Sequence, residues 1–296
     1  MRRTALLLPF TLLVGTAAAC GGGDEVVIEA TPSALKAASD ATVDTGTASA
    51  EVTISMDIAA LGLDEPMVLS GDGTYDLGAG AMTLSISVGD MFRQIIGASG
   101  TDVPDAISDL LDQPLSLTQI GTDQYQCFAL YEQFAGSPCI HFDFAELTGV
   151  QGGGGLSGLN FADPSSLLES MGASDSVEQV GEEDLDGVHT VHLSGTYTPR
   201  RALDALSDED AASLQDTLER QGLGDEFLDT PQAFDVWIDD DDHVRQVHQA
   251  VEIPNAGHVD AQVHFTEFGV DASVAAPEDF VEAADVPGFS QLFGGG

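Results

Sequence analysis

A single cysteine near the amino terminus, Cys20, is the residue of this chain best placed for covalent chemistry. It follows Arg2 and Arg3, an apolar run over residues 5–14, and the small residues 15–19. A basic start, a short apolar core and small residues before a cleavage point are typical of a secretory signal, and the run is too short for a membrane-spanning helix. The thiol of Cys20 would therefore lie at the cleavage point of an exported chain.

This arrangement makes a lipobox and resembles the signal of bacterial lipoproteins. The resemblance implies that residues 1–19 are a signal peptide and that Cys20 becomes the first mature residue, carrying acyl chains such as palmitate. The body would then be anchored by lipid to the cell membrane, on its extracytoplasmic face. Residues 20–30, which begin Cys-Gly-Gly-Gly-Asp-Glu, would serve as a flexible tether. A plain signal peptide with an incidental cysteine is the alternative interpretation.

The chain is strongly acidic, with 50 Asp and Glu against 8 Lys and Arg and a formal net charge of −42. A field of this sign repels nucleic acids and anionic headgroups, so we expect no nucleic-acid partner. Such charge often accompanies disorder, but the 43% hydrophobic content favours a folded core. We interpret the acidity as a means of solvation, suited to a saline habitat. Divalent cation binding is the alternative, although no Asp-x-Asp-x-Asp-Gly loop with a distal Glu occurs.

Two further cysteines, Cys127 and Cys139, lie in consecutive runs that are expected to form strands, residues 124–131 and 138–144. The six residues 132–137 between the runs can turn the chain. Because an exported compartment permits disulfides and a hairpin brings such positions together, we expect a Cys127–Cys139 bridge. Zinc binding by this pair is disfavoured, because a structural zinc site needs four ligands.

Alternation of apolar and polar residues predicts long antiparallel strands. The clearest run covers residues 47–58, where alanine, valine, isoleucine and methionine share one face. Further strands are expected at residues 67–77, 81–88, 115–120, 176–181, 188–197, 233–238, 244–253 and 258–268. Helices are expected at residues 31–41, 90–96, 104–111, 163–171 and 199–222.

This order of elements, without β-α-β alternation, predicts an α+β fold with one curved antiparallel sheet. The few helices are the available cover for its apolar face. We expect a single domain over residues 31–286, in which the glycine-rich residues 149–158 form a mobile connection. Residues 287–296 are expected to be a loose carboxyl-terminal tail.

The sequence contains no motif typical of an enzyme. There is no Gly-x-Ser-x-Gly elbow, His-Glu-x-x-His pair or glycine fingerprint after a strand. His189 and His192 should face opposite sides of one strand, which makes them poor partners for one metal ion. His248 and His264 are expected on the polar faces of neighbouring strands, where holding a cation is one interpretation and solvated surface histidines are the favoured one. We therefore expect no catalytic residues, no metal and no cofactor.

The order of several short segments resembles the actinobacterial lipoproteins of the LppX/LprG type, which share the half-barrel fold of the LolA carriers. The best single match is residues 234–239, Phe-Asp-Val-Trp-Ile-Asp, followed by residues 244–247. The remaining matches are residues 47–53, 71–76, 121–125, 141–147, 180–190 and 265–270. The resemblance implies an open, strongly bent sheet with helices on its concave face. It also implies an apolar cavity between sheet and helices that accepts acyl chains.

The resemblance directs attention to eight apolar residues as candidates for lining such a cavity: Val52, Ile54, Met56, Leu84, Ile86, Val191, Leu193 and Val247. Ordinary core packing is the alternative for each of them. The functional hypothesis is a non-catalytic, monomeric lipoprotein that binds or carries a lipid or lipoglycan by its acyl chains. The alternative hypothesis is a cell-surface interaction or sensor module on the same fold, without lipid transport.

The anchor can be tested by replacing Cys20 with alanine. Because the thiol is the expected point of acylation, Cys20→Ala should move the exported protein from the membrane pellet to the soluble fraction. The distribution is measured by immunoblotting after a salt wash, with the wild-type chain as control. A mutant that stays in the pellet would contradict the lipoprotein hypothesis.

Overall fold

The computed structural model describes residues 30–58, 65–98, 105–143, 174, 176–204, 211, 215, 218, 223–254 and 257–286. Several expectations lie outside these residues: the signal with Cys20, the connection at 149–158, the helix at 163–171, the tail at 287–296 and most of the segment 205–222. None of the helices in the described part of the chain has both the length and the apolar character needed to cross a membrane.

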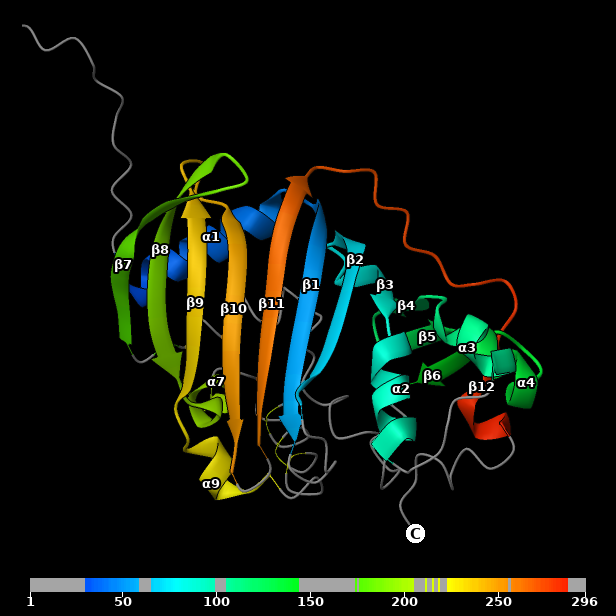
Figure 1. The fold of residues 1–296 in the computed structure, drawn as a ribbon. Helices are drawn as coiled ribbons and strands as arrows, with labels where there is room; N and C mark the ends of the chain where they lie inside the picture. The colour runs from blue at the N-terminus through cyan, green and yellow to red at the C-terminus, as the bar shows by residue number, and fades with distance from the viewer. Residues whose placement is uncertain are drawn as a thin grey trace, which may run out of the picture.

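One twelve-stranded sheet dominates the fold (Figure 1). Its strands follow the order β12-β6-β5-β4-β3-β2-β1-β11-β10-β9-β8-β7, and all neighbours are antiparallel except β12 and β6. The sheet is open, because β12 and β7 form its two edges. The strands are β1 (Thr47–Ile58), β2 (Met67–Asp76), β3 (Ala81–Ser87), β4 (Leu115–Ile120), β5 (Asp123–Cys127), β6 (Cys139–Asp143), β7 (Ser176–Leu185), β8 (Val188–Tyr197), β9 (Gln232–Asp239), β10 (Val244–Ile253), β11 (Gly257–Phe268) and β12 (Val281–Glu282). The predicted α+β class with one open sheet is confirmed.

Helix α1 (Pro32–Asp44) lies behind β8–β11 in the view of Figure 1 and is fastened to that face of the sheet. The side chain of Thr31 caps its start by accepting from the backbone N–H of Ala34 at 3.1 Å, and Pro32 occupies the first turn. The hydroxyl of buried Thr42 accepts from the backbone N–H of Val244 on β10 at 2.8 Å. This bond joins the helix directly to the sheet.

The remaining helices are short and lie near the two ends of the sheet. Two of them, α7 and α9, lie near the ends of β8–β10, whereas α2, α3 and α4 lie beside β3–β6 (Figure 1). Their bounds are α2 (Gly89–Ala98), α3 (Asp105–Leu111), the 3-10 turn η2 (Ala129–Tyr131), α4 (Glu132–Ala135), α7 (Pro199–Asp204), α9 (Asp225–Leu228) and the 3-10 turn η3 (Ala283–Asp285).

Two predicted strand boundaries are wrong. The strand expected at 124–131 ends at Cys127, because the N–H of Tyr131 donates to the carbonyl of Phe128 at 2.9 Å and the chain turns into η2 and then α4. The strand expected at 176–181 continues as β7 to Leu185, because a register shift between Gln179 and Gly181 absorbs an extra residue and pairing with β8 resumes.

Near the carboxyl-terminal end of the described residues, β12 pairs in parallel with β6 and forms one edge of the sheet. This strand was not predicted from the sequence. His141 on β6 lies between two carboxylates, with Glu282 at 2.7 Å and Asp123 at 2.8 Å. Burial disfavours the charged imidazole, but these two hydrogen bonds outweigh it and raise the pKa of His141. His141 therefore fastens the returning chain to β5 and β6.

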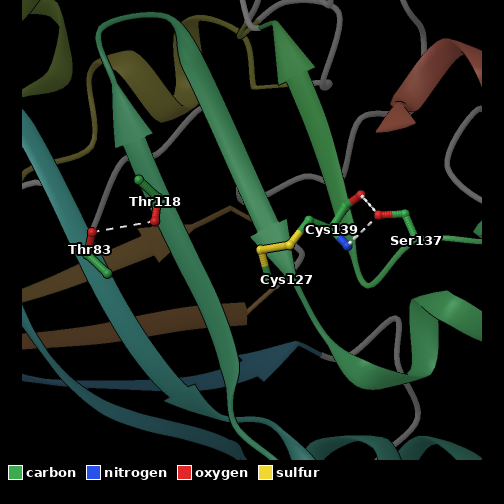
Figure 2. The surroundings of a disulfide bond; sticks show 5 residues. All are labelled: Thr83, Thr118, Cys127, Ser137 and Cys139. Carbon is green, nitrogen blue, oxygen red and sulfur yellow. Dashed lines mark hydrogen bonds between the residues drawn. A yellow bond between two sulfur atoms is a disulfide. The ribbon is translucent and has the colours of Figure 1, made fainter. Parts of the chain in front are cut away.

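The expected disulfide between Cys127 and Cys139 is present (Figure 2). The two cysteines are direct cross-strand partners on β5 and β6, with Cα atoms 4.0 Å apart. The Ser137 hydroxyl accepts from the N–H of Cys139 at 3.2 Å and donates to its carbonyl at 3.1 Å. The bridge thus closes the segment that contains η2 and α4.

Removing the bridge should cost stability. A loop closed over a sequence separation of 12 contributes about 3 kcal/mol by the chain-entropy model. The double variant Cys127→Ser/Cys139→Ser should lose about that much free energy of unfolding, measured by denaturant titration without reductant. Reduced wild-type protein is the control and should match the variant. Two free thiols in the exported, unreduced wild type would contradict the bridge.

Candidate functional site

The buried apolar side chains of the described residues form four clusters, three large ones over most of the sheet and a small one that joins β6 to η3. The first lies under α1 and includes Val52, Val236 and Val263 from the centre of the sheet. The second joins Met56 and Val259 to the short helices near α9, including Phe227. The third packs Val88, Leu111 and Phe128 beneath α2 and α3. The apolar face is therefore covered by separate groups of helices.

The eight predicted cavity residues all lie on this face, but they do not have equal access to solvent. Six are buried: Val52, Met56, Leu84, Val191, Leu193 and Val247. Ile54 and Ile86 are partly buried. The six buried residues contribute to well-packed clusters, so Ile54 and Ile86 are the positions where a ligand could be reached.

Four partly buried apolar residues lie where the three clusters meet. Ile54 contacts the first and second clusters, and Ile86 contacts the first and third. Leu69 and Met91 each contact the second and third. Ile54 and Leu69 are also direct cross-strand partners on β1 and β2. We call Ile54, Leu69, Ile86 and Met91 the junction residues; Ile54 and Ile86 were predicted from the sequence, whereas Leu69 and Met91 were not.

A sharp bend between β2 and β3 shapes this junction. Gly71 and Gly73 of β2 face the apolar side, and any Cβ on them would overlap the carbonyl oxygens of Ser85 and Thr83 on β3. A residue with a side chain would therefore hold the two strands apart at this point. The glycines let β3 fold toward the apolar face, consistent with β3–β6 turning away from the larger half of the sheet in Figure 1.

A groove of about 380 Å³ lies at the same bend, and polar residues make up most of its lining. Most of its lining comes from the outward-facing residues Ser49, Glu51, Asp72, Thr74, Thr83, Ser85, Ser116 and Thr266. Glu51 and Asp72 are direct cross-strand partners, so two like charges face each other there. The groove is thus a feature of the polar face, distinct from the apolar junction.

The histidines are held by carboxylates rather than lying free in solvent. His189 lies 3.0 Å from Asp240, and the hydrogen bond between them raises the pKa of His189. His264 is paired with Asp186 at 3.5 Å, whereas His248 is paired with other aspartates. Within the part of the chain that the structure describes, no group of three or more His, Cys, Asp or Glu is arranged to hold a metal ion.

No protein-family model matches the chain. A curated relative is an uncharacterized 31.2 kDa protein of Streptomyces griseus, encoded between rplA and rplJ, which is 26% identical over 150 residues. The alignment covers 51% of this chain and 47% of that protein, so the match spans about half of the relative's length.

Solved structures similar to this chain include two mycobacterial proteins. The lipoprotein LppX of Mycobacterium tuberculosis aligns over 83% of this chain and 100% of its own, with 13% identity and a TM-score of 0.44. LprF of Mycobacterium bovis aligns over 83% of this chain and 98% of its own, with 13% identity and a TM-score of 0.42.

The bend can be tested by adding one methyl group at its centre. Gly73→Ala places a Cβ against the backbone of β3, so the free energy of unfolding should fall by about 1–3 kcal/mol, as in other overpacked sites. The matched control is Gly181→Ala on β7, where an added Cβ meets nothing within 4 Å. Denaturant titration measures both variants. Equal stability of the two would contradict the role given to Gly73.

Proposed function

We propose that this protein is an extracytoplasmic lipoprotein that shields the acyl chains of a lipid or lipoglycan against the apolar face of its sheet. It does so without catalysing a reaction. The observation that carries the proposal is the group of four junction residues. They are apolar, they lie on the apolar face of the sheet beside the bend, and the three buried clusters around them leave them only partly buried.

The physical driving force is the removal of apolar surface from water. Each methylene of an acyl chain that becomes buried contributes about 0.8 kcal/mol, so a chain of ordinary length can bind through hydrophobic contact alone. The carboxylates on the outer face favour solvent, whereas Ile54, Leu69, Ile86 and Met91 offer a ligand only apolar contacts. A headgroup would therefore remain near water while the tail enters the junction.

The anchor and the location belong to the same proposal. Acyl chains on Cys20 would hold the domain at the extracytoplasmic face of the cell membrane, with residues 20–30 as the tether. The repulsion between a chain of net charge −42 and anionic headgroups would keep the folded body away from the bilayer surface. We propose that the protein works there as a monomer and does not bind nucleic acid.

The test fills the junction with a larger side chain. Ile54→Trp should displace part of the bound tail. Loss of contact with about two methylenes costs about 1.6 kcal/mol, which is a tenfold or greater loss of affinity. Uptake of a fluorescent long-chain fatty acid by the mature protein measures the effect. Ile54 is preferable to Leu84, because the complete burial of Leu84 means that tryptophan there would overpack the core.

Thr53→Trp is the matched control, since Thr53 neighbours Ile54 on β1 but faces the exposed polar side. This variant should take up the probe as the wild type does, and both variants should retain the wild-type circular dichroism spectrum. Equal uptake by both variants would contradict binding at the junction. A wild-type protein that takes up no probe would favour the interaction or sensor module.

A further inference from the structure

The outer, polar face of strands β7–β11 carries an unbroken chain of alternating carboxylates and imidazoles. Its successive distances are 3.2, 2.9, 3.5, 3.3 and 2.7 Å. The six members come from five adjacent strands: Glu183 on β7, His192 on β8, Asp235 on β9, His248 on β10, and Asp260 and His258 on β11. We call these six residues the histidine–carboxylate chain.

Strand register brings these residues together. Asp235 is the direct cross-strand partner of His248, and Asp260 lies on the next strand beside it. The residues next in sequence to His192, Asp235 and His248 point to the opposite face. These residues, Leu193, Val236 and Val247, are buried in the first cluster. The histidine–carboxylate chain therefore lies on the opposite face of the same strands from the first cluster.

Both ring nitrogens of two histidines face carboxylates. In His192, Nδ1 faces Glu183 and Nε2 faces Asp235; in His248, Nδ1 faces Asp235 and Nε2 faces Asp260. A neutral imidazole has one N–H, so it can donate to only one carboxylate and turns a lone pair toward the other. A protonated imidazole donates to both. The links across β7–β11 are complete only when these rings carry their second proton.

Protonation also decides the local charge. With neutral histidines the three carboxylates repel one another, whereas three imidazolium groups balance them. Three neighbouring carboxylates add further negative charge. Glu178 lies on β7, and Glu252 and Asp57 are the cross-strand partners of His258. Neither of the two nearby basic groups balances this charge, because His264 is paired with Asp186 and Arg245 on β10 is paired with Asp239 at 2.6 Å. Protons on the histidines are thus the nearby source of positive charge.

We propose that the histidine–carboxylate chain is a proton-operated clamp that joins β7–β11 when its histidines are protonated and releases the edge strands β7 and β8 when they are not. The carboxylates supply fixed acceptors, and the two central imidazoles supply the removable links. The clamp acts on the sheet itself and does not depend on whether the apolar face binds a lipid.

The pKa shifts have the directions that this arrangement requires. The hydrogen bond to Asp235 raises the pKa of His248, and the hydrogen bond from His248 is the main cause that lowers the pKa of Asp235 to about 2. The contribution of His248 is complete below its unfolded pKa of about 6.5 and is lost as pH rises through the folded value. The contribution of Asp235 is present above about pH 3.9 and is lost as pH falls toward its folded value.

Trp237 provides a built-in reporter. It is the only tryptophan in the sequence, and its ring stacks on that of His192 with centroids 4.3 Å apart. Its indole N–H also donates to Glu183 at 2.6 Å. Protonation of His192 places a cation on the face of the indole, so the emission of Trp237 should change as the clamp closes.

The experiment measures amide hydrogen exchange of the mature protein at about pH 5.5 and about pH 8, on either side of the ordinary histidine pKa. Protection factors corrected for intrinsic exchange should be about tenfold or more higher in β7 and β8 at the lower pH, the effect of one lost hydrogen bond to a charged group. Trp237 emission should titrate over the same range. Unchanged protection and unchanged emission in the wild type would overturn the proposal.

Two variants separate the clamp from general pH effects. His192→Gln removes the imidazole that links β7 and β8 to β9 and should abolish the pH dependence of protection in β7 and β8. His141→Gln is the matched control, because His141 also bridges two carboxylates but lies at the opposite end of the sheet. His248→Gln, which removes the next link between β9 and β11, is the second variant if His192→Gln does not fold, and it should reduce the pH dependence. Retention of the full wild-type pH dependence in a folded clamp variant, or its loss in His141→Gln, would overturn the proposal.

Discussion

Successive side chains of an antiparallel strand point to opposite faces of the sheet, and the other features of this protein depend on that alternation. On β1, Val52 and Met56 are buried inside while Glu51 and Thr53 face outward. The same pattern on β8–β10 places Val236 and Val247 behind Asp235 and His248. One sheet therefore presents an apolar face to its helices and a charged face to solvent, and each face has its own chemistry.

The charged face must accommodate many carboxylates with few basic residues. Arg93, Arg200 and Arg245 are each bonded to aspartates, which leaves most of the acidic surplus without an arginine partner. Histidine fills part of this gap, because a proton turns a neutral ring into a cation where carboxylates already converge. The charge balance of the larger half of the sheet is thus linked to pH, while the apolar face opposite it is not.

Much of the fold could be predicted from the sequence, because alternation marks strands such as β1 and β11 and turn residues mark their ends. The Cys127–Cys139 bridge was predictable for the same reason, since both cysteines lie in adjacent strand-like runs. The strand expected at 124–131 was wrong because a 3-10 turn, closed by the hydrogen bond from the N–H of Tyr131 to the carbonyl of Phe128, ends it. Leu69 and Met91 were missed as junction residues, because their exposure depends on how three clusters meet across the bend at Gly73. The shared carboxylates of His192 and His248 depend on register, which periodicity alone does not specify.

The claim that the apolar face holds acyl chains is tested most directly by native mass spectrometry of the mature protein purified from the membranes of its own host. Gentle ionisation should retain a complex whose mass exceeds that of the acylated chain, and collisional activation should release a species with lipid acyl chains. This species should diminish in Ile54→Trp and persist in Thr53→Trp. A wild-type protein that shows only its own acylated mass under the same conditions would contradict the account.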